Sequence, residues 1–346
     1  MSKLILAVAL IFALAIPASA VEFTAPQVPE KGAELMPEDT GSFAAGLMEL
    51  LRDAVLGLRP DLKEASKVSL GVIAAVMMVS LLQSFSGSVK TVANLVGATA
   101  IAVGLLLSAN SLIRLGSQTV TEISEYGKLL LPVMTAAMAA QGGAASSTAL
   151  YAGTAVFDSV LSSLISRMLG PMVYLFLALS AANGAIGENI LGKLRDLVKN
   201  VVSWSLKTIL TVFTTYMTVT GVVSGTTDAA ALKATKVTIS SVVPVVGGIL
   251  SDASEAVLVS AGLMKNAAGI YGILAVLAVF LSPFLKIGVH YLILKLTAAV
   301  CGIFGEKGLT ELIGDFSTAM GLLLAMTGSE CLLLLISTVC FLKGVG

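Results

Sequence analysis

The chain has 346 residues, of which 56% are hydrophobic and only 12% are charged. This charged share is about half that of an ordinary soluble domain, which excludes a conventional water-soluble protein. The 21 basic and 21 acidic residues cancel, so the chain lacks the positive field that attracts nucleic acid, and we expect no nucleic-acid partner.

Residues 1–20 have the pattern of a signal peptide. Lys3 supplies the positive charge, Leu4–Ile16 is an apolar run of suitable length, and small residues follow up to Ala20. We expect cleavage after Ala20, with an uncleaved anchor as the alternative. In both cases residues 21–66 form an extracytoplasmic segment.

An amphipathic helix is predicted within that segment, from Ser42 to Leu58. Ser42 is suited to cap its first turn and Pro60 to end it. A surface contact with protein is favoured over one with lipid, because the charged residues do not form a basic face. Apolar residues recur at helical spacing: Phe43, Leu47, Leu50, Leu51, Ala54, Val55 and Leu58.

Long intervals without any charged residue dominate the rest of the chain. A hydrocarbon core about 30 Å thick needs roughly 20 apolar residues of helix to cross it, and backbone groups in lipid must be paired within the segment. We therefore expect residues 67–346 to form an all-α, polytopic membrane domain that contacts lipid and is located in the cell membrane. The intervals of 20 residues or more are Val68–Val89, Thr91–Ile113, Leu129–Phe157, Met168–Gly187, Thr208–Thr227 and Asn266–Leu285.

Two short apolar segments combine proline with paired glycines, which is typical of broken or re-entrant helices. They are Leu129–Gly143, around Pro132, and Val237–Leu250, around Pro244, Gly247 and Gly248.

These two segments also suggest an internal duplication. Pro171 follows Pro132 by 39 residues, and Pro283 follows Pro244 by the same interval. The corresponding repeat units would cover about residues 92–190 and 204–306. Residue identity between them is low, so a chance match in an Ala-rich chain stays open.

The densest basic cluster predicts the cytoplasmic side of the membrane. By the positive-inside rule, Lys193, Arg195, Lys199 and Lys207 face the cytoplasm. A chain that starts outside then needs an odd number of crossings before Glu188. Five crossings result if Leu129–Ser147 spans the membrane and four if it re-enters, and the sequence leaves both open.

Enzymatic chemistry is not indicated. His290 is the only histidine, and neither H-E-x-x-H nor G-x-S-x-G occurs, which argues against a His-ligated metal site or a Ser–His hydrolase. We expect no catalytic residue, cofactor or metal, and no enzyme.

Polar residues at membrane depth are the candidate functional residues. Glu330 lies inside the otherwise uncharged run Phe316–Leu342, where an ionisable group is costly and is a functional candidate by default. A helix break at Thr327–Ser329, which would place Glu330 at an interface, is the alternative. Lys286 and His290, one helical turn apart, are its expected partners by residue type. Asp158 and Asp252 flank the two proline-containing segments and are candidates for gating.

Three phrases carry a resemblance to a known family: Val242–Ala253 (VVPVVGGILSDA), Leu263–Gly269 and Pro283–Lys286. Together with the signal peptide, they resemble the stage III sporulation protein AE family. The resemblance implies a membrane subunit of the channel between mother cell and forespore in endospore-forming bacteria. It also implies a location in the mother-cell membrane around the forespore. Implied partners are other membrane subunits and a secretion-type ATPase; no catalytic residues are implied.

A stand-alone secondary transporter with paired re-entrant hairpins is the alternative function. A transporter should gather similar polar groups at both hairpin tips. Here the first tip offers Gln141 and Ser146–Thr148, and the second offers Ser251 and Asp252. This asymmetry, with the resemblance, favours the channel subunit.

Overall fold

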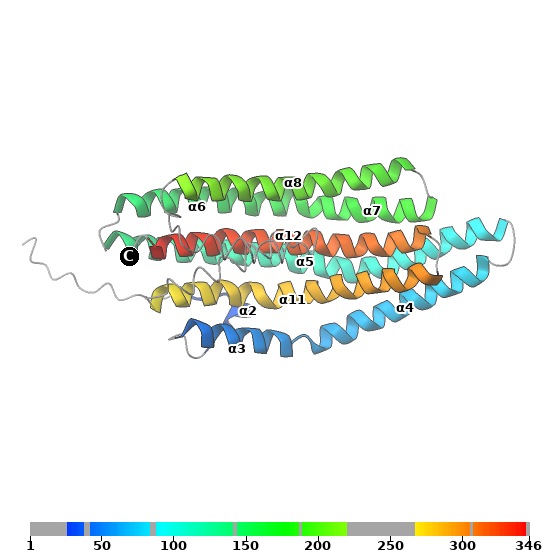
Figure 1. The fold of residues 1–346 in the computed structure, drawn as a ribbon, viewed down its shortest axis with the longest axis horizontal. Helices are drawn as coiled ribbons and strands as arrows, with labels where there is room; N and C mark the ends of the chain where they lie inside the picture. Colours follow the sequence, from blue (N-terminus) through cyan, green and yellow to red (C-terminus); the bar gives the residue numbers. More distant parts are fainter. Residues whose placement is uncertain are drawn as a thin grey trace, which may run out of the picture.

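A computed structural model describes residues 26–37, 42–83, 88–140, 144–186, 189–219, 267–304 and 307–343. Over these ranges the chain contains helices and turns and no strand, so the predicted all-α membrane fold is confirmed. The long helices lie side by side along one axis; α6 continues into α7 in the same direction, and the other long helices alternate in direction along the chain (Figure 1).

In the part of the chain that the structure describes, two short helices precede the long ones. The short helices are α2 (Glu30–Ala33) and α3 (Phe43–Leu56); the elements that follow are α4 (Arg59–Gln83), α5 (Ser88–Ala140), α6 (Ala144–Leu164), the π-helical turn η1 (Ile165–Leu169), α7 (Gly170–Ile186), α8 (Asn189–Val219), α11 (Ala267–Phe304) and α12 (Lys307–Lys343).

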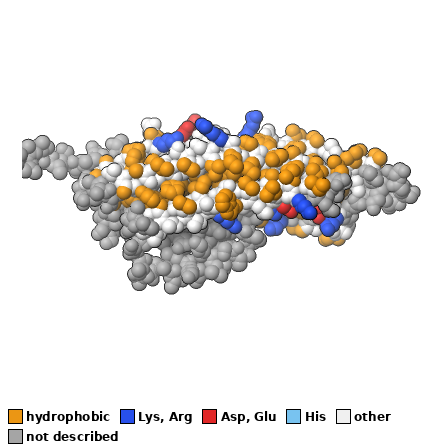
Figure 2. Space-filling view, turned by 90° about the horizontal axis from the view of Figure 1, so that it is seen from above, with side chains coloured by type: hydrophobic (Ala, Val, Ile, Leu, Met, Phe, Trp, Pro, Cys, Tyr) orange, Lys and Arg blue, Asp and Glu red, His pale blue; other side chains and the backbone are white. Residues whose placement is uncertain are grey.

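Within the described residues, five helical stretches are long and apolar enough to cross a membrane: Phe43–Leu82, Val92–Ala139, Ser147–Ile186, Gly269–Ile303 and Lys307–Leu342. Large hydrophobic side chains cover much of the outside, among them Leu70, Leu107 and Ile303. On the face in Figure 2 they form a broad apolar surface with charged side chains at its margins. A surface of this kind suits lipid or another protein rather than water, and the protein is a multi-pass membrane protein.

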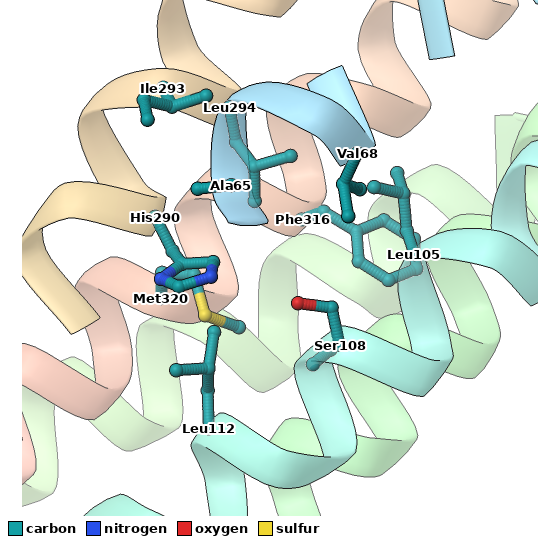
Figure 3. Close-up of a pocket in the computed structure, with 11 residues that line it drawn as sticks. Ala65, Val68, Leu105, Ser108, Leu112, His290, Ile293, Leu294, Phe316 and Met320 are labelled. Carbon is teal, nitrogen blue, oxygen red and sulfur yellow. The ribbon is translucent and has the colours of Figure 1, made fainter. Parts of the chain in front are cut away.

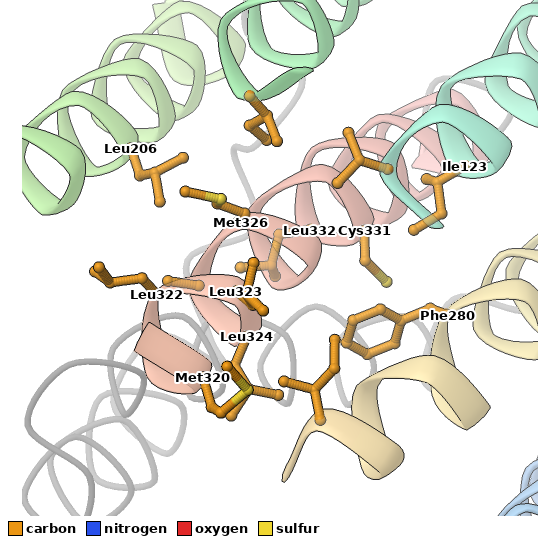
Figure 4. Packing of buried hydrophobic residues seen from close by; sticks show 14 of the residues in the cluster. Ile123, Leu206, Phe280, Met320, Leu322, Leu323, Leu324, Met326, Cys331 and Leu332 are labelled. Atoms are coloured by element: carbon orange, nitrogen blue, oxygen red, sulfur yellow. The ribbon is translucent and has the colours of Figure 1, made fainter. Parts of the chain in front are cut away.

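Helix α12 forms the centre of the bundle. It packs against α5, α6, α7, α8 and α11, and 94% of its most apolar stretch is buried, against 22–61% for the other candidate spans. Its hydrophobic residues meet side chains such as Leu206, Phe280 and Ile123 from surrounding helices (Figure 4). Of the five candidate spans, α12 is therefore the one that meets protein on almost every side.

The helices are long in comparison with a lipid bilayer. Helix α5 has 53 residues, which at 1.5 Å per residue is about 80 Å. Helices α11 and α12 have 38 and 37 residues, or about 55 Å each. The hydrocarbon core is only about 30 Å thick.

Helix α5 corrects the prediction for Leu129–Gly143. It continues without a break through Pro132 to Ala140, so Leu129–Ala140 is neither a span of its own nor a re-entrant segment. Proline removes one backbone hydrogen bond inside a helix, and α5 tolerates this loss at Pro132, whose side chain is exposed. The second segment, Val237–Leu250, lies outside the described residues.

The crossing count changes with this correction. Before Glu188 the described chain passes along the bundle three times: in α4, in α5 and in α6–η1–α7. The count is odd, as the basic cluster requires, but it is neither the five nor the four that the sequence left open.

The amphipathic helix predicted from Ser42 is found as α3. Phe43, Leu50 and Ala54 are buried, and Gly46 packs against Leu274 of α11, so α3 docks on the protein itself. Pro60 is the second residue of α4, because a proline near the start of a helix costs no hydrogen bond. The next helix, α4, therefore begins at Arg59, with two residues between it and the end of α3.

Helix α3 and the start of α8, which carries Lys193, lie toward opposite ends of the bundle (Figure 1). We expect single cysteines at Met48, which is exposed on α3, and at Lys193, exposed near the start of α8, to react from opposite sides of the membrane. Labelling intact cells with an impermeant maleimide should modify only the Met48→Cys protein. The natural cysteines Cys301, Cys331 and Cys340 are buried, so the unsubstituted chain serves as the control. Modification of both variants would contradict the odd count.

Candidate functional site

The candidate site is a pair of buried carboxyl groups where α5, α6 and α12 meet. Glu330 on α12 is fully buried and Asp158 on α6 is 2% exposed. Their carboxyl groups interact electrostatically across the helix interface, although no hydrogen bond of normal geometry joins them. The structure thus brings together two candidates that the sequence singled out for separate reasons.

Few hydrogen-bond donors reach this pair. The Ser124 hydroxyl on α5 donates to Asp158 Oδ2 at 2.8 Å. Within the described part of the chain, Asp158 Oδ1 and both carboxyl oxygens of Glu330 have no hydrogen-bond partner. Lys128, one turn after Ser124, lies on the exposed side of α5 and attracts both carboxyl groups. Three of the four carboxyl oxygens are therefore buried without a donor.

A glycine allows the helices to approach closely here. A Cβ atom added at Gly127 would lie 2.9 Å from Leu334 Cδ1 of α12 and 3.7 Å from Asp158 Oδ1. One turn along α6, the Thr154 hydroxyl donates to Ser337 Oγ of α12 at 3.0 Å. Small and hydroxyl-bearing residues therefore form the polar contact between α6 and its neighbours inside an otherwise apolar core.

Neither expectation for the surroundings of Glu330 is correct. Helix α12 is continuous from Lys307 to Lys343, so there is no break at Thr327–Ser329. The hydroxyls of Thr327 and Ser329 instead donate to carbonyls one turn earlier, an arrangement that a regular helix accommodates. Glu330 is therefore inside the core rather than at an interface.

Lys286 and His290 are occupied elsewhere and do not pair with Glu330. Lys286 Nζ lies 3.7 Å from Asp61 Oδ2 of α4, and His290 Nδ1 hydrogen-bonds the Lys286 carbonyl at 2.9 Å. The His290 ring and the Ser108 hydroxyl point into a cavity between α4, α5, α11 and α12, whose other walls are apolar (Figure 3). This cavity has room for nothing larger than a water molecule.

A partly buried ion pair joins α8 to α12. Arg195 Nη1 lies 2.6 Å from Asp315 Oδ2, and both side chains are 14% exposed. Burial lowers the pKa of Arg195, but the carboxylates of Asp315 and Asp196 raise it more, so that its pKa lies above the ordinary value. Arg195 is therefore a permanent cation that fixes α8 on the central helix.

Sequence reasoning missed Ser124, Lys128 and Asp315. Ser124 and Lys128 share a helix face by their spacing, but nothing in the sequence showed that this face meets Asp158. Asp252, Pro244, Gly247, Gly248 and Ala20 lie outside the described residues, so their predicted roles stay predictions.

Comparison with known proteins identifies the family. Residues 41–344 match the family of stage III sporulation protein AE. Stage III sporulation protein AE of Bacillus subtilis (strain 168) is 25% identical over 199 residues, which is 57% of this chain and 50% of the relative. The match thus spans about half the length of that relative. No solved structure matches the chain. A family match over this much of the sequence means that the chain belongs to the stage III sporulation protein AE family.

Proposed function

We propose that this protein is a non-enzymatic, integral membrane subunit of a sporulation-specific channel that links mother cell and forespore. The family match over residues 41–344 is the observation that carries the proposal. In this proposal the protein lies in the mother-cell membrane around the forespore and works with other membrane subunits and a secretion-type ATPase.

The fold supports a role within an assembly. The outside of the bundle is apolar over helices that are longer than a bilayer is thick. Apolar surface beyond the hydrocarbon core needs cover from protein. The exposed Trp204 on α8, a helix that is not among the candidate spans, is a residue type that often anchors protein interfaces.

Purification of the tagged full-length chain from sporulating cells in mild detergent tests this proposal. We expect membrane proteins and an ATPase to co-purify, and we expect a Trp204→Glu variant to retain fewer of them, because a buried charge without a partner weakens an interface. Ile190 is also exposed on this helix. The Ile190→Ala variant is compared with Trp204→Glu, because it removes apolar area without adding charge.

The same chain expressed in vegetative cells serves as a specificity control, since it should purify without the sporulation-dependent partners. A different result would support the transporter alternative: the chain purifies from sporulating cells without partners, and the reconstituted single chain transports a solute.

A further inference from the structure

Two ionised carboxylates could not remain side by side at the Asp158–Glu330 site. Glu330 is fully buried and Asp158 nearly so, and burial of a charge in a low-dielectric interior is costly unless donors or a counter-charge compensate it. Repulsion between two like charges raises the cost further. The only hydrogen bond from the described residues to the pair comes from Ser124.

We propose that Asp158 and Glu330 form a proton-binding site that holds one proton between them. Glu330 carries the proton and donates a hydrogen bond to Asp158 Oδ1, an oxygen that otherwise has no donor. Asp158 is the better anion because Ser124 already donates to its Oδ2, and a donated hydrogen bond favours the charged form of a carboxyl group. Neither oxygen of Glu330 has such a donor.

The surrounding charges fit a pair with one negative charge. Lys128 on α5 attracts both carboxyl groups from the protein surface and balances a single negative charge. Cys331 lies beside Glu330 on α12, and Tyr271 of α11 interacts with Tyr126 of α5. Within its described residues, α8 adds no charged group that acts on the pair.

A proton fits this site better than a metal ion does. Calcium takes six to eight oxygen ligands and magnesium takes an octahedral set, in each case from several carboxylates, carbonyls or waters. In the described part of the chain no three acidic, histidine or cysteine side chains come close enough to hold a metal. A proton requires only one donor oxygen and one acceptor oxygen, and the pair supplies both.

Loss of this proton would place two negative charges between α6 and α12. Polar contacts of α6 at this level include the hydroxyl pair of Thr154 with Ser337 of α12 and the hydrogen bond from Ser124 of α5 to Asp158. Repulsion between the carboxylates would therefore act on the α6–α12 contact, and proton binding would stabilise the packed arrangement. This inference does not depend on the proposed channel function.

Infrared spectroscopy of the purified full-length protein tests the site directly. A protonated carboxyl group has a carbonyl band that an ionised carboxylate lacks and that shifts in D₂O. We expect this band in the unsubstituted protein at pH 7, retained in Asp158→Asn and lost in Glu330→Gln. Glu125→Gln removes an exposed acid next to Ser124 and should leave the band unchanged.

Other patterns would overturn the proposal. An absent band at pH 7 would mean that both acids are ionised. A band that survives Glu330→Gln but not Asp158→Asn would place the proton on Asp158. If a variant does not fold, the pH titration of the band in the unsubstituted protein decides between a proton-holding and an ionised pair.

Thermal unfolding gives a second readout. A proton held by the folded but not the unfolded protein makes stability fall as pH rises. From pH 6 to pH 9 the unfolding midpoint of the unsubstituted protein should therefore fall by about 2 °C or more relative to that of Glu330→Gln. At constant ionic strength, replacing choline chloride with sodium chloride should not change the midpoint. Specific stabilisation by sodium would show that a metal ion occupies the site instead.

Discussion

Replacement of Arg195 with alanine should destabilise the folded protein by about 1.5–3 kcal/mol, because it leaves a partly buried carboxylate without its charged hydrogen-bond partner. Asp315 lies 2.6 Å from the guanidinium and is 14% exposed, so water cannot fully replace the lost partner. The same change removes the ion pair that joins α8 to α12. We therefore expect the first loss of structure to be the release of α8 from the central helix.

A double-substitution cycle in purified protein measures this coupling. Arg195→Ala and Asp315→Ala should each lower the thermal unfolding midpoint, and the double variant should be more stable than the sum of the two losses predicts. Lys193→Ala is a matched control, since Lys193 is exposed two residues away on the same helix. Purely additive losses would mean that the two side chains act independently.

Replacement of Gly153 with alanine should destabilise the protein by about 1–3 kcal/mol through overpacking. A Cβ atom at this position would lie 2.5 Å from Tyr216 Cζ and 2.6 Å from the Tyr216 hydroxyl. The rigid ring would have to move away from α6. That movement would break the hydrogen bond from the Tyr216 hydroxyl to the Ala149 carbonyl and disturb the ring contact with Phe157.

Gly104→Ala provides the opposite case for comparison. A Cβ atom at Gly104 meets nothing within 4 Å, and alanine is about 1 kcal/mol more favourable than glycine inside a helix. The two substitutions should therefore shift the unfolding midpoint in opposite directions. Equal unfolding midpoints for Gly153→Ala and Gly104→Ala would show that the Tyr216 ring moves aside without cost. Helices α6 and α8 would then not be tightly packed around Gly153.

The sequence predicted the helices well because lipid imposes a simple requirement on the backbone. The helix from Ser42 was also readable from its apolar spacing. The re-entrant interpretation of Leu129–Gly143 failed because a proline costs a helix one hydrogen bond but need not end it, and a long packed membrane helix tolerates that loss. At Pro132 the ring points outward, and this orientation depends on helices elsewhere in the chain.

The candidate site was only half predictable. Glu330 and Asp158 each stood out as acids in or beside apolar runs, which is a local signal. Their pairing is a long-range property, because it depends on α5, α6 and α12 meeting at one level of the bundle. Lys286 was an equally suitable partner by charge, but its position on α11 brings it to Asp61 instead.

The central position of α12 has a consequence for biosynthesis. The helices that surround it, α5 to α8 and α11, all precede it in the chain, and a nascent protein is made from its N-terminus at about 5–20 residues per second. These helices are inserted before the element that fills the space between them, so until it arrives their inward faces need lipid or an assisting protein. Glu330 must then enter the membrane on an apolar helix, at a cost of about 2.5–3.5 kcal/mol if charged, and maturation ends only when it reaches Asp158.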